Sequence, residues 1–201
     1  MFAGIIRELG TVSRVERSKG LTHLSIYAPK TTARVERLES VAVNGVCLSV
    51  VDLSRQAMVF EMIPETQRLT TLGNLRSGDR VHVEPSLSLS DRLGGHILFG
   101  HVDGLGTVVK RRQLAGELVL EIRIPPQLRT FLVPKGPVAV DGVSLTVGAR
   151  LTTSTFSIHL IPETLRQTTL RSRLVGERVN VELDYLAKLV SQLVRSHPHP
   201  R

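Results

Sequence analysis

Apolar and polar residues alternate in short runs along most of the chain, a pattern typical of half-buried β-strands. The runs include LTHLSIYA, AMVFEMI and RVHVE in the first half, and ELVLEIRI, FSIHLI and RVNVEL in the second. Turn-forming stretches such as SKG, SGD and PKG separate these runs. Short strands at this spacing predict an antiparallel sandwich or a small barrel.

The same pattern occurs twice in the chain. VAVNGVCLSV at Val41–Val50 returns as VAVDGVSLTV at Val138–Val147, with seven of the ten positions identical. Three further pairs of blocks recur in the same order: GIIRELGTV with GHVDGLGTV, IPETQRLTTL with IPETLRQTTL, and GDRVHVE with GERVNVE. The period is too long and the copies too few for a solenoid, so the sequence predicts two tandem homologous domains.

A domain of this size with several short strands hides its strand edges by closing on itself. We therefore expect an all-β protein of two six-stranded antiparallel (Greek-key) β-barrels, over residues 1–96 and 97–184, plus a C-terminal α-helix. The connector SLSLSDRLGGHILFGH contains Ser and Gly that favour a mobile or tightly turned link.

Residues 185–201 follow a different period. The apolar positions of a single helical stripe are Leu186, Leu189, Val190, Leu193 and Val194. Asp184 is well placed as the N-cap of this helix. The stripe could be buried on its own barrel or against the helices of other subunits, and the pattern leaves both open. The final SHPHPR predicts a disordered tail.

Composition narrows the class of protein. The chain has 201 residues, and no apolar run approaches the ~20 residues that span a bilayer. Its start, MFAGIIRELG, lacks the features of a signal peptide. The single cysteine, Cys47, excludes an internal disulfide and a cysteine metal cluster. These features predict a cytoplasmic protein that does not enter a membrane.

The net charge of +8 raises the question of an anionic partner. The basic residues are scattered, however, and no platform of aromatic and basic residues accompanies them, so we do not expect nucleic acid as a partner. A solvated arginine-rich surface and attraction to an anionic ligand or partner remain open. His23, His82 and His159 lack the spacing of a metal triad, so no metal is expected.

Differences between the two copies identify candidate reactive residues. Both copies keep a G-V-x-L-[ST]-V strand and an I-P-E-T turn, whose backbone edge and hydroxyls suit a flat heterocycle or a polyol. Cys47 is either a small core residue or a nucleophile or proton carrier. His101 replaces Ile5 of the first copy, and histidine is the side chain best suited to proton transfer near neutral pH. His96 is interpreted as a turn residue, and Asp141 as completing a turn in place of Asn44.

MFAGII, VAVNGVCLSVV, GGHILFGHVDG, KGPVAVDGVSLTV and HLIPETLRQTTL closely resemble the riboflavin synthase family, α-chain type, over nearly the whole chain. The resemblance implies a transferase that needs no cofactor. It would dismutate two 6,7-dimethyl-8-ribityllumazine molecules by four-carbon transfer, giving riboflavin and 5-amino-6-(ribitylamino)uracil. It also implies a homotrimer in which residues 185–201 contribute a trimerisation helix and each barrel binds one lumazine. The working site would lie between the N-terminal barrel of one subunit and the C-terminal barrel of its neighbour.

The resemblance also assigns residues by position. Cys47, His101 and Ser144 are the catalytic candidates. The first pocket is expected to consist of Gly4, Ile5, Ile6, Ser40, Cys47, Leu48, Ser49, Glu61, Met62, Ile63, Pro64, Glu65 and Thr66. The second is expected to consist of Gly100, His101, Val102, Ser144, Leu145, Thr146, His159, Leu160, Ile161, Pro162, Glu163 and Thr164. Asp184 would meet the ribityl chain, and Lys135 would reach the ligand of a neighbouring subunit.

The chain departs from the family pattern at four positions: Ala3, Gln67, His82 and Phe99. Members of the family that the chain resembles usually have Thr, Leu, Asn and a small Ser at these positions. The alternative function is a non-catalytic lumazine- or flavin-binding paralogue. Such relatives tend to lose the Cys and hydroxyl groups of one pocket, and this chain retains both sets. Association with lumazine synthase, the enzyme that makes the lumazine, is a further expected partnership for the basic surface.

Overall fold

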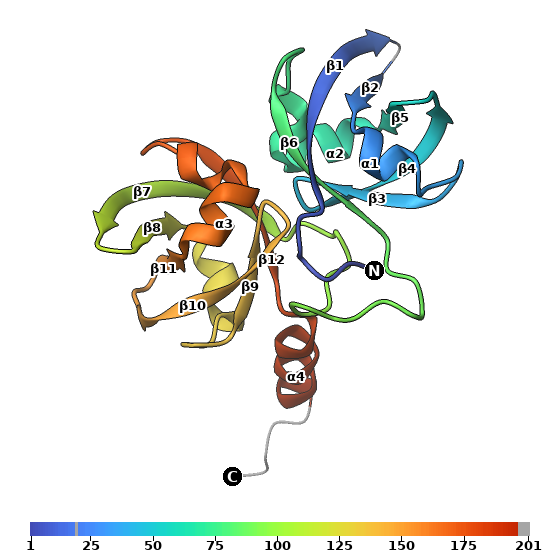
Figure 1. The fold of residues 1–201 in the computed structure, drawn as a ribbon. Coiled ribbons are helices and arrows are strands. Elements are labelled where there is room, and N and C mark those ends of the chain that lie inside the picture. The colour runs from blue at the N-terminus through green and yellow to red at the C-terminus, as the bar shows by residue number, and fades with distance from the viewer. Residues whose placement is uncertain (19, 197–201) are drawn as a thin grey trace.

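The computed structural model describes residues 1–18 and 20–196 and contains two closed six-stranded barrels followed by a helix (Figure 1). The predicted all-β fold with two antiparallel barrels and a C-terminal helix is confirmed. The tail predicted to be disordered falls almost wholly at 197–201, outside the described residues.

The N-terminal barrel closes in the order β1-β2-β5-β4-β3-β6, with every pairing antiparallel. Its strands are β1 (Glu8–Ser18), β2 (Leu21–Tyr27), β3 (Ser40–Val43), β4 (Val46–Leu53), β5 (Ala57–Met62) and β6 (Arg80–Pro85). Its short helices are α1 (Pro29–Thr32), α2 (Pro64–Leu69) and the 3-10 turn η1 (Thr71–Asn74).

The C-terminal barrel repeats this circular order with its own six strands. They are β7 (Gly104–Leu114), β8 (Glu117–Arg123), β9 (Pro137–Val140), β10 (Val143–Leu151), β11 (Thr155–Leu160) and β12 (Arg178–Leu183). Its helices are η2 (Pro126–Phe131), α3 (Pro162–Gln167) and η3 (Thr169–Ser172), and the chain continues into α4 (Tyr185–Ser196). In both barrels a proline opens the helix that follows the fifth strand, since its fixed φ suits the first helical turn.

Each barrel encloses its own core of mostly Val, Leu and Ile. Phe60 is buried in the first core cluster and Phe156 in the second, and both are almost fully buried. Burying this apolar surface at about 25 cal/mol per Å² is the main favourable term in forming each barrel. The alternation read from the sequence places these side chains inward and their neighbours outward.

The barrels meet back to back at their Asn-Gly and Asp-Gly turns. Asn44 and Asp141 have φ of 45° and 48°, the left-handed values that such hairpin turns require. A Cβ on Gly45 would lie 2.5 Å from the backbone nitrogen of Gly142, so only glycine permits this approach. The interpretation of Asp141 as a turn residue is confirmed.

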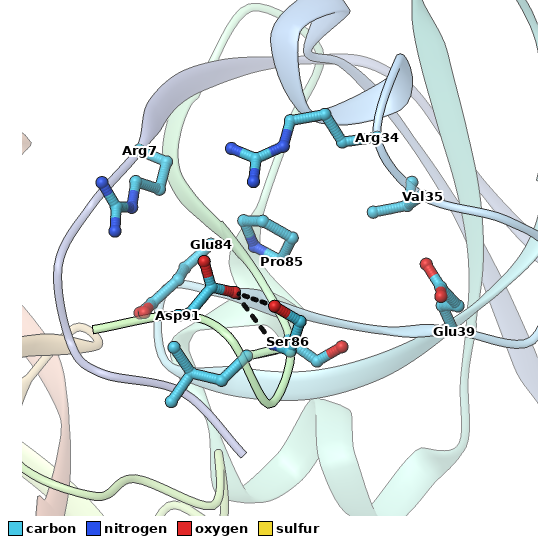
Figure 2. A pocket seen from close by; sticks show the side chains of 10 residues that line it. Arg7, Arg34, Val35, Glu39, Glu84, Pro85, Ser86 and Asp91 are labelled. Carbon is cyan, nitrogen blue, oxygen red and sulfur yellow. Dashed lines mark hydrogen bonds between the residues drawn. The ribbon is translucent and has the colours of Figure 1, made fainter. Parts of the chain in front are cut away.

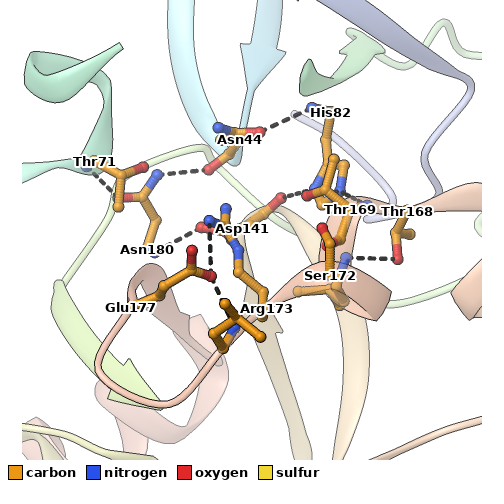
Figure 3. Close-up of polar contacts among 12 residues, drawn as sticks. Asn44, Thr71, His82, Asp141, Thr168, Thr169, Ser172, Arg173, Glu177 and Asn180 are labelled. Carbon is orange, nitrogen blue, oxygen red and sulfur yellow. Dashed lines mark hydrogen bonds and ion pairs between the residues drawn. The ribbon is translucent and has the colours of Figure 1, made fainter. Parts of the chain in front are cut away.

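A buried polar network crosses this seam (Figure 3). From the C-terminal barrel, Asn180 donates its side-chain amide to the Asn44 carbonyl at 2.8 Å and accepts the Thr71 N–H at 2.8 Å. Within the C-terminal barrel itself, the Arg173 guanidinium donates to the fully buried Asp141 carboxylate at 2.8 Å. Because buried polar groups are costly when unpaired, the two bonds from Asn180 to the first barrel fix how one barrel lies against the other.

Helix α4 projects away from the two barrels (Figure 1), and none of its residues is buried within the chain. Its predicted apolar positions are exposed, from 39% at Leu189 to 68% at Val194. Packing of the stripe on its own barrel, one of the two open alternatives, is therefore not what the fold shows. Among the described residues, no helix has the length and apolar character needed to cross a membrane.

Candidate functional site

Each barrel has one place where two neighbouring strands separate. In the first, β4 pairs with β3 from Val46 to Ser49 but pairs with β5 only from Val50 onward. The segment around Cys47 therefore has one open backbone edge. In the second barrel, β10 pairs with β9 from Val143 to Thr146 but with β11 only from Val147 onward. The repeated G-V-x-L-[ST]-V motif thus supplies the open edge in both barrels.

A segment from elsewhere in the chain lies against each open edge. The Cys47 N–H donates to the Gly100 carbonyl at 2.9 Å, and the Ser144 N–H donates to the Gly4 carbonyl at 2.8 Å. Because alternate residues of a strand present their N–H groups to the same side, Ser49 and Thr146 face the same edges one step further on. These two residues are exposed, so their backbone groups and hydroxyls are open to a ligand.

Both segments need glycine at the contact. Gly4 and Gly100 have φ of 73° and 74°, values that favour glycine. A Cβ on Gly4 would lie 2.6 Å from the Cβ of Ser144, and a Cβ on Gly100 would lie 2.6 Å from the Cβ of Cys47. The glycines therefore allow the backbone to approach each strand edge closely.

The two segments are exchanged between the barrels. Ile6, which precedes the first barrel, packs against the core of the second, whereas Val102, which precedes the second, packs against the core of the first. The sequence-based grouping, which placed 4–6 in the first pocket and 100–102 in the second, was wrong. Each segment therefore contacts the other barrel before the chain continues into the first strand of the barrel that follows it in sequence.

The C-terminal barrel's open edge borders a cavity of about 190 Å³. It is lined by seven of the expected residues, namely Gly4, Ile5, Ile6, Ser144, Ile161, Glu163 and Thr164, and by Val143, Gln167 and Thr168. Strand β10, helix α3 and the exchanged N-terminal segment supply these residues.

Ser144 is paired with a histidine that the sequence interpretation treated as a turn residue. The His96 Nδ1 lies 2.7 Å from the Ser144 hydroxyl, and its Nε2 is buried without a hydrogen-bond partner in the described structure. The pKa of His96 is lowered by burial, against the smaller raising effect of the Asp184 carboxylate. A neutral imidazole with a free nitrogen can accept a proton, so His96 is a candidate base. The one sequence signal for it is the first histidine of GGHILFGH.

The first barrel's open edge carries the other two catalytic candidates. Cys47 is partly buried and packs against a small cluster that includes Phe2 and Leu98. His101 is exposed and follows Gly100, whose carbonyl is bonded to Cys47. The structure therefore places a thiol and an imidazole on the same edge, while the matching edge has Ser144 and His96.

Three expected ligand contacts have side chains inside the barrels. Leu48, Met62 and Leu160 are at most 6% exposed and belong to the core clusters, so their side chains are not available to a ligand outside the barrels. Glu61 and His159 are exposed and face their neighbouring strands. The carboxylate of Glu61 lies 3.8 Å from His23, and the Nδ1 of His159 lies 2.9 Å from Glu117.

The remaining expected residues lie around these edges. Ser40 is partly buried opposite Ser49, and the Ile63–Thr66 turn opens α2 as Ile161–Thr164 opens α3. Asp184 accepts the Leu186 N–H at 3.2 Å and so caps α4. Lys135 is exposed at a left-handed turn on the second barrel.

Two buried carboxyls hold the exchanged segments, and the sequence interpretation missed both. Glu84 accepts the N–H groups of Ala3 and Gly4 at 2.8 and 3.1 Å, and Glu182 accepts those of Phe99 and Gly100 at 2.7 and 3.1 Å. Burial raises the pKa of each carboxyl to about 7, against the lowering effect of these N–H donors. Their signal was the Val-Glu pair that ends both RVHVE and RVNVE.

The first barrel has another hollow, of about 200 Å³, and Glu84 is one of the residues that line it (Figure 2). Arg7 and Arg34 border it, together with Asp91, whose pKa is lowered chiefly by the Ser88 N–H that it accepts. None of the expected site residues lines this hollow. Within 1–18 and 20–196, no group of three or more His, Cys, Asp or Glu side chains is placed to hold a metal ion.

The chain is similar to known proteins in sequence and in structure. A model described as the lumazine binding domain matches residues 3–86 and again 99–184. The chain is 43% identical over 200 residues to a Mycobacterium tuberculosis protein named riboflavin synthase, covering 98% of this chain and 99% of that one. It is 36% identical over 188 residues to the Bacillus subtilis protein of the same name, covering 94% and 87%.

Solved structures agree with the fold. LumP complexed with 6,7-dimethyl-8-(1'-D-ribityl) lumazine matches with a TM-score of 0.82, and LumP complexed with riboflavin with 0.84. Both are 25% identical; the match covers 92% of this chain, with 99% of the first LumP chain and 100% of the second. The chain therefore belongs to the riboflavin synthase family, built from two lumazine-binding domains.

Proposed function

We propose that the protein is a catalytically active riboflavin synthase. It would convert two molecules of 6,7-dimethyl-8-ribityllumazine into riboflavin and 5-amino-6-(ribitylamino)uracil by four-carbon transfer. The observation that carries this proposal is the presence of two matching open strand edges that both keep their polar groups. One edge has Cys47 and Ser49, and the other has Ser144 and Thr146. Two molecules of one substrate call for two such sites.

Each open strand edge suits the polar edge of one lumazine ring. The backbone groups of a strand edge can pair with the amide and carbonyl groups of a flat pyrimidinedione ring. Thr66 and Thr164 lie at the starts of α2 and α3, and Thr164 lines the cavity beside Ser144. Their hydroxyls are assigned to the ribityl chain. Asp184 at the start of α4 is a further acceptor for that chain.

The two edges differ in the groups that move protons. One lumazine must lose a proton from its 7-methyl group, and the other must become electrophilic. Cys47 with His101 on one edge, and Ser144 with His96 on the other, are therefore assigned to proton transfer or transient addition. Holding two rings against each other contributes as well, since well-oriented pairs can gain ~7–11 kcal/mol.

The complete site forms between subunits of a homotrimer in this proposal. Support comes from the exposed apolar stripe of α4, including Leu186, Val190 and Val194, which the chain itself leaves uncovered. An amphipathic helix normally buries such a stripe, and the helices of other copies can do so. Lys135, exposed on the second barrel, would then reach the ligand of a neighbouring subunit.

Incubation of the purified protein with 6,7-dimethyl-8-ribityllumazine tests the proposal. We expect one riboflavin, detected by its fluorescence, for every two lumazines consumed, without an added cofactor. The second candidate, a lumazine- or flavin-binding protein without catalysis, is favoured by the LumP structures. Binding of lumazine to both sites without riboflavin formation would establish that candidate instead.

A further inference from the structure

Three aromatic rings form a row at the edge of the first barrel's site. The ring of Phe99 lies 4.8 Å from that of Tyr185, tilted by 55°, and 6.1 Å from that of His101, at an interplanar angle of 26°. Both separations fall in the range over which aromatic rings attract one another. The row connects the candidate histidine to the first residue of α4.

The backbone beneath the row is fixed. Glu182 accepts the N–H groups of Phe99 and Gly100, and the Gly100 carbonyl accepts the Cys47 N–H. The imidazole of His101 is exposed and has no hydrogen bond or ion pair among the described residues. Its directional contact is the stack on Phe99, so that ring is what restricts the orientation of His101.

The other end of the row is held by α4. Lys188, one turn into the helix, places its ammonium 5.7 Å from the centre of the Tyr185 ring and donates to both oxygens of Asp103 at 2.9 and 3.0 Å. Asp103 also accepts the Leu183 N–H at 2.8 Å. The segment that carries His101 is thus attached to the start of α4 on both sides, through Phe99 and through Asp103.

The matching place in the first copy has none of this arrangement. Ala3 occupies the position of Phe99 and is buried, while Ile5 occupies that of His101. The backbone bonds to the buried glutamate are the same in both copies. The aromatic row is therefore an addition to the second segment and is not needed to hold the backbone.

We propose that Phe99 is a positioning residue, which sets the orientation of the His101 imidazole at the first barrel's site and links it to the seating of α4. This inference rests on the proposed function, because it assumes that His101 takes part in the reaction. Phe99 itself acts only through His101.

Kinetics of riboflavin formation provide the first test. We expect Phe99→Ala to lower kcat about three- to tenfold with less than a twofold change in KM, which corresponds to the loss of one aromatic pair. Phe99→Tyr, which keeps the stack, should restore kcat. In a His101→Gln background, Phe99→Ala should have no further effect on kcat. An equal loss in both backgrounds would overturn the proposal.

A matched control separates this effect from a general disturbance of α4. Phe131 also contacts α4, with the guanidinium of Arg195 5.9 Å from its ring, but it lies outside the row. Phe131→Ala should leave kcat within about twofold of the unsubstituted protein, compared at concentrations where light scattering gives the same mass. A loss equal to that of Phe99→Ala would mean that helix seating alone is responsible.

A readout independent of activity distinguishes failure of this inference from failure of the proposed function. In the full-length protein with ring-labelled histidine, stacking on Phe99 shifts the His101 ring-proton resonance by the ring current. Phe99→Ala should move this resonance toward that of a solvent-exposed histidine, and Phe99→Tyr should not. If the unsubstituted protein makes no riboflavin, the proposed function fails; if the resonance does not move, the positioning role fails.

Discussion

His82 and Asn180 make the same two hydrogen bonds from opposite sides of the seam. The His82 Nδ1 is 2.7 Å from the Asp141 carbonyl and its Nε2 accepts the Thr169 N–H at 2.8 Å (Figure 3). Asn180 donates to the Asn44 carbonyl and accepts the Thr71 N–H in the matching places. The imidazole therefore reproduces an amide, with Nδ1–H as donor and Nε2 as acceptor. The departure from the family's usual Asn at position 82 is explained by this geometry.

Substitutions at His82 should follow that equivalence. His82→Asn restores one acceptor and one donor, so we expect little change in the urea midpoint of unfolding. His82→Leu leaves the Asp141 carbonyl and the Thr169 N–H buried without partners, which should lower the free energy of unfolding by about 2–4 kcal/mol. Similar losses in both variants would show that ring packing, and not hydrogen bonding, is what His82 contributes.

The pH dependence of stability should change in the same variants. Burial lowers the pKa of His82 below 6.5, against the raising effect of Asp141. The folded state then binds fewer protons than the unfolded state, so this contribution is present above about pH 6.5 and is lost as the pH falls through the folded pKa. Urea titrations of the unsubstituted protein and His82→Asn should therefore agree near pH 7 and separate as the pH falls, with the unsubstituted protein becoming the less stable of the two. Parallel curves would contradict this.

The buried glutamates should affect binding in the opposite barrel from the one that carries them. Glu84 lies on β6 of the first barrel but holds the segment that lines the second barrel's cavity. Glu84→Ala should therefore weaken ligand binding at the second barrel roughly tenfold, or ~1.4 kcal/mol. Glu182→Ala should do the same at the first barrel. Riboflavin titrations, with bound crystal structures to identify the occupied site, provide the measurement; weakening within the same barrel would contradict the exchange.

These two carboxyls also predict a pH effect opposite in sign to that of His82. Since burial raises the pKa of both to about 7, the folded state retains protons that the unfolded state releases. Their contribution is therefore present below about pH 4.5 and is lost as the pH rises through about 7. Urea midpoints of Glu84→Ala and Glu182→Ala should fall less over this range than those of the unsubstituted protein.

The fold could be predicted from the sequence because the patterns that indicate strands and turns are local and occur in both copies. Alternation of apolar residues gives the strands, and the Asn-Gly and Asp-Gly pairs give the turns that meet at the seam. The exchange of 4–6 and 100–102 could not be predicted this way. A repeat shows that Gly4 matches Gly100, but both copies would align equally well if each segment contacted its own barrel.

The site was predicted only in part for a related reason. Cys47, Ser144 and His101 differ between the copies, and that difference draws attention to them. His96 lies in the connector, where its pairing with Ser144 depends on a contact between residues far apart in sequence. Glu84 and Glu182 are unchanged between the copies and resemble ordinary strand residues, so only their burial and N–H partners reveal what they hold.

Replacing Gly100 tests the close approach of the exchanged segment. A side chain there must adopt a left-handed φ, which costs ~1–2 kcal/mol, and its Cβ would overlap the Cβ of Cys47. Gly100→Ala should push His101 away from the edge and reduce kcat more than tenfold. Gly116 also has a positive φ, but a Cβ added there would meet no atom within 4 Å, so it provides the control. Gly116→Ala should retain activity.

The thiol of Cys47 should matter to the reaction more than to binding. Cys47→Ser keeps the size of the side chain and the backbone bond to Gly100, so lumazine affinity should change by less than about threefold. If the thiol adds to the substrate or carries a proton, kcat should fall more than tenfold. Stopped-flow turnover and lumazine titration measure the two quantities separately. Comparable losses in both would count against a chemical role.

Helix α4 allows assembly to be tested without unfolding the barrels. Val190 is 60% exposed on the apolar stripe, and no residue of α4 is buried within the chain. Val190→Asp should therefore leave the barrels folded, as seen by circular dichroism, while placing a charge in the proposed contact between helices. We expect light scattering to show subunits of lower mass and riboflavin formation to fall with them, because each complete site needs two subunits. Gln192→Asp adds the same charge at an exposed polar position of the same helix. It should keep the oligomer and its activity; full activity of a monomeric Val190→Asp protein would instead place the whole reaction within one chain.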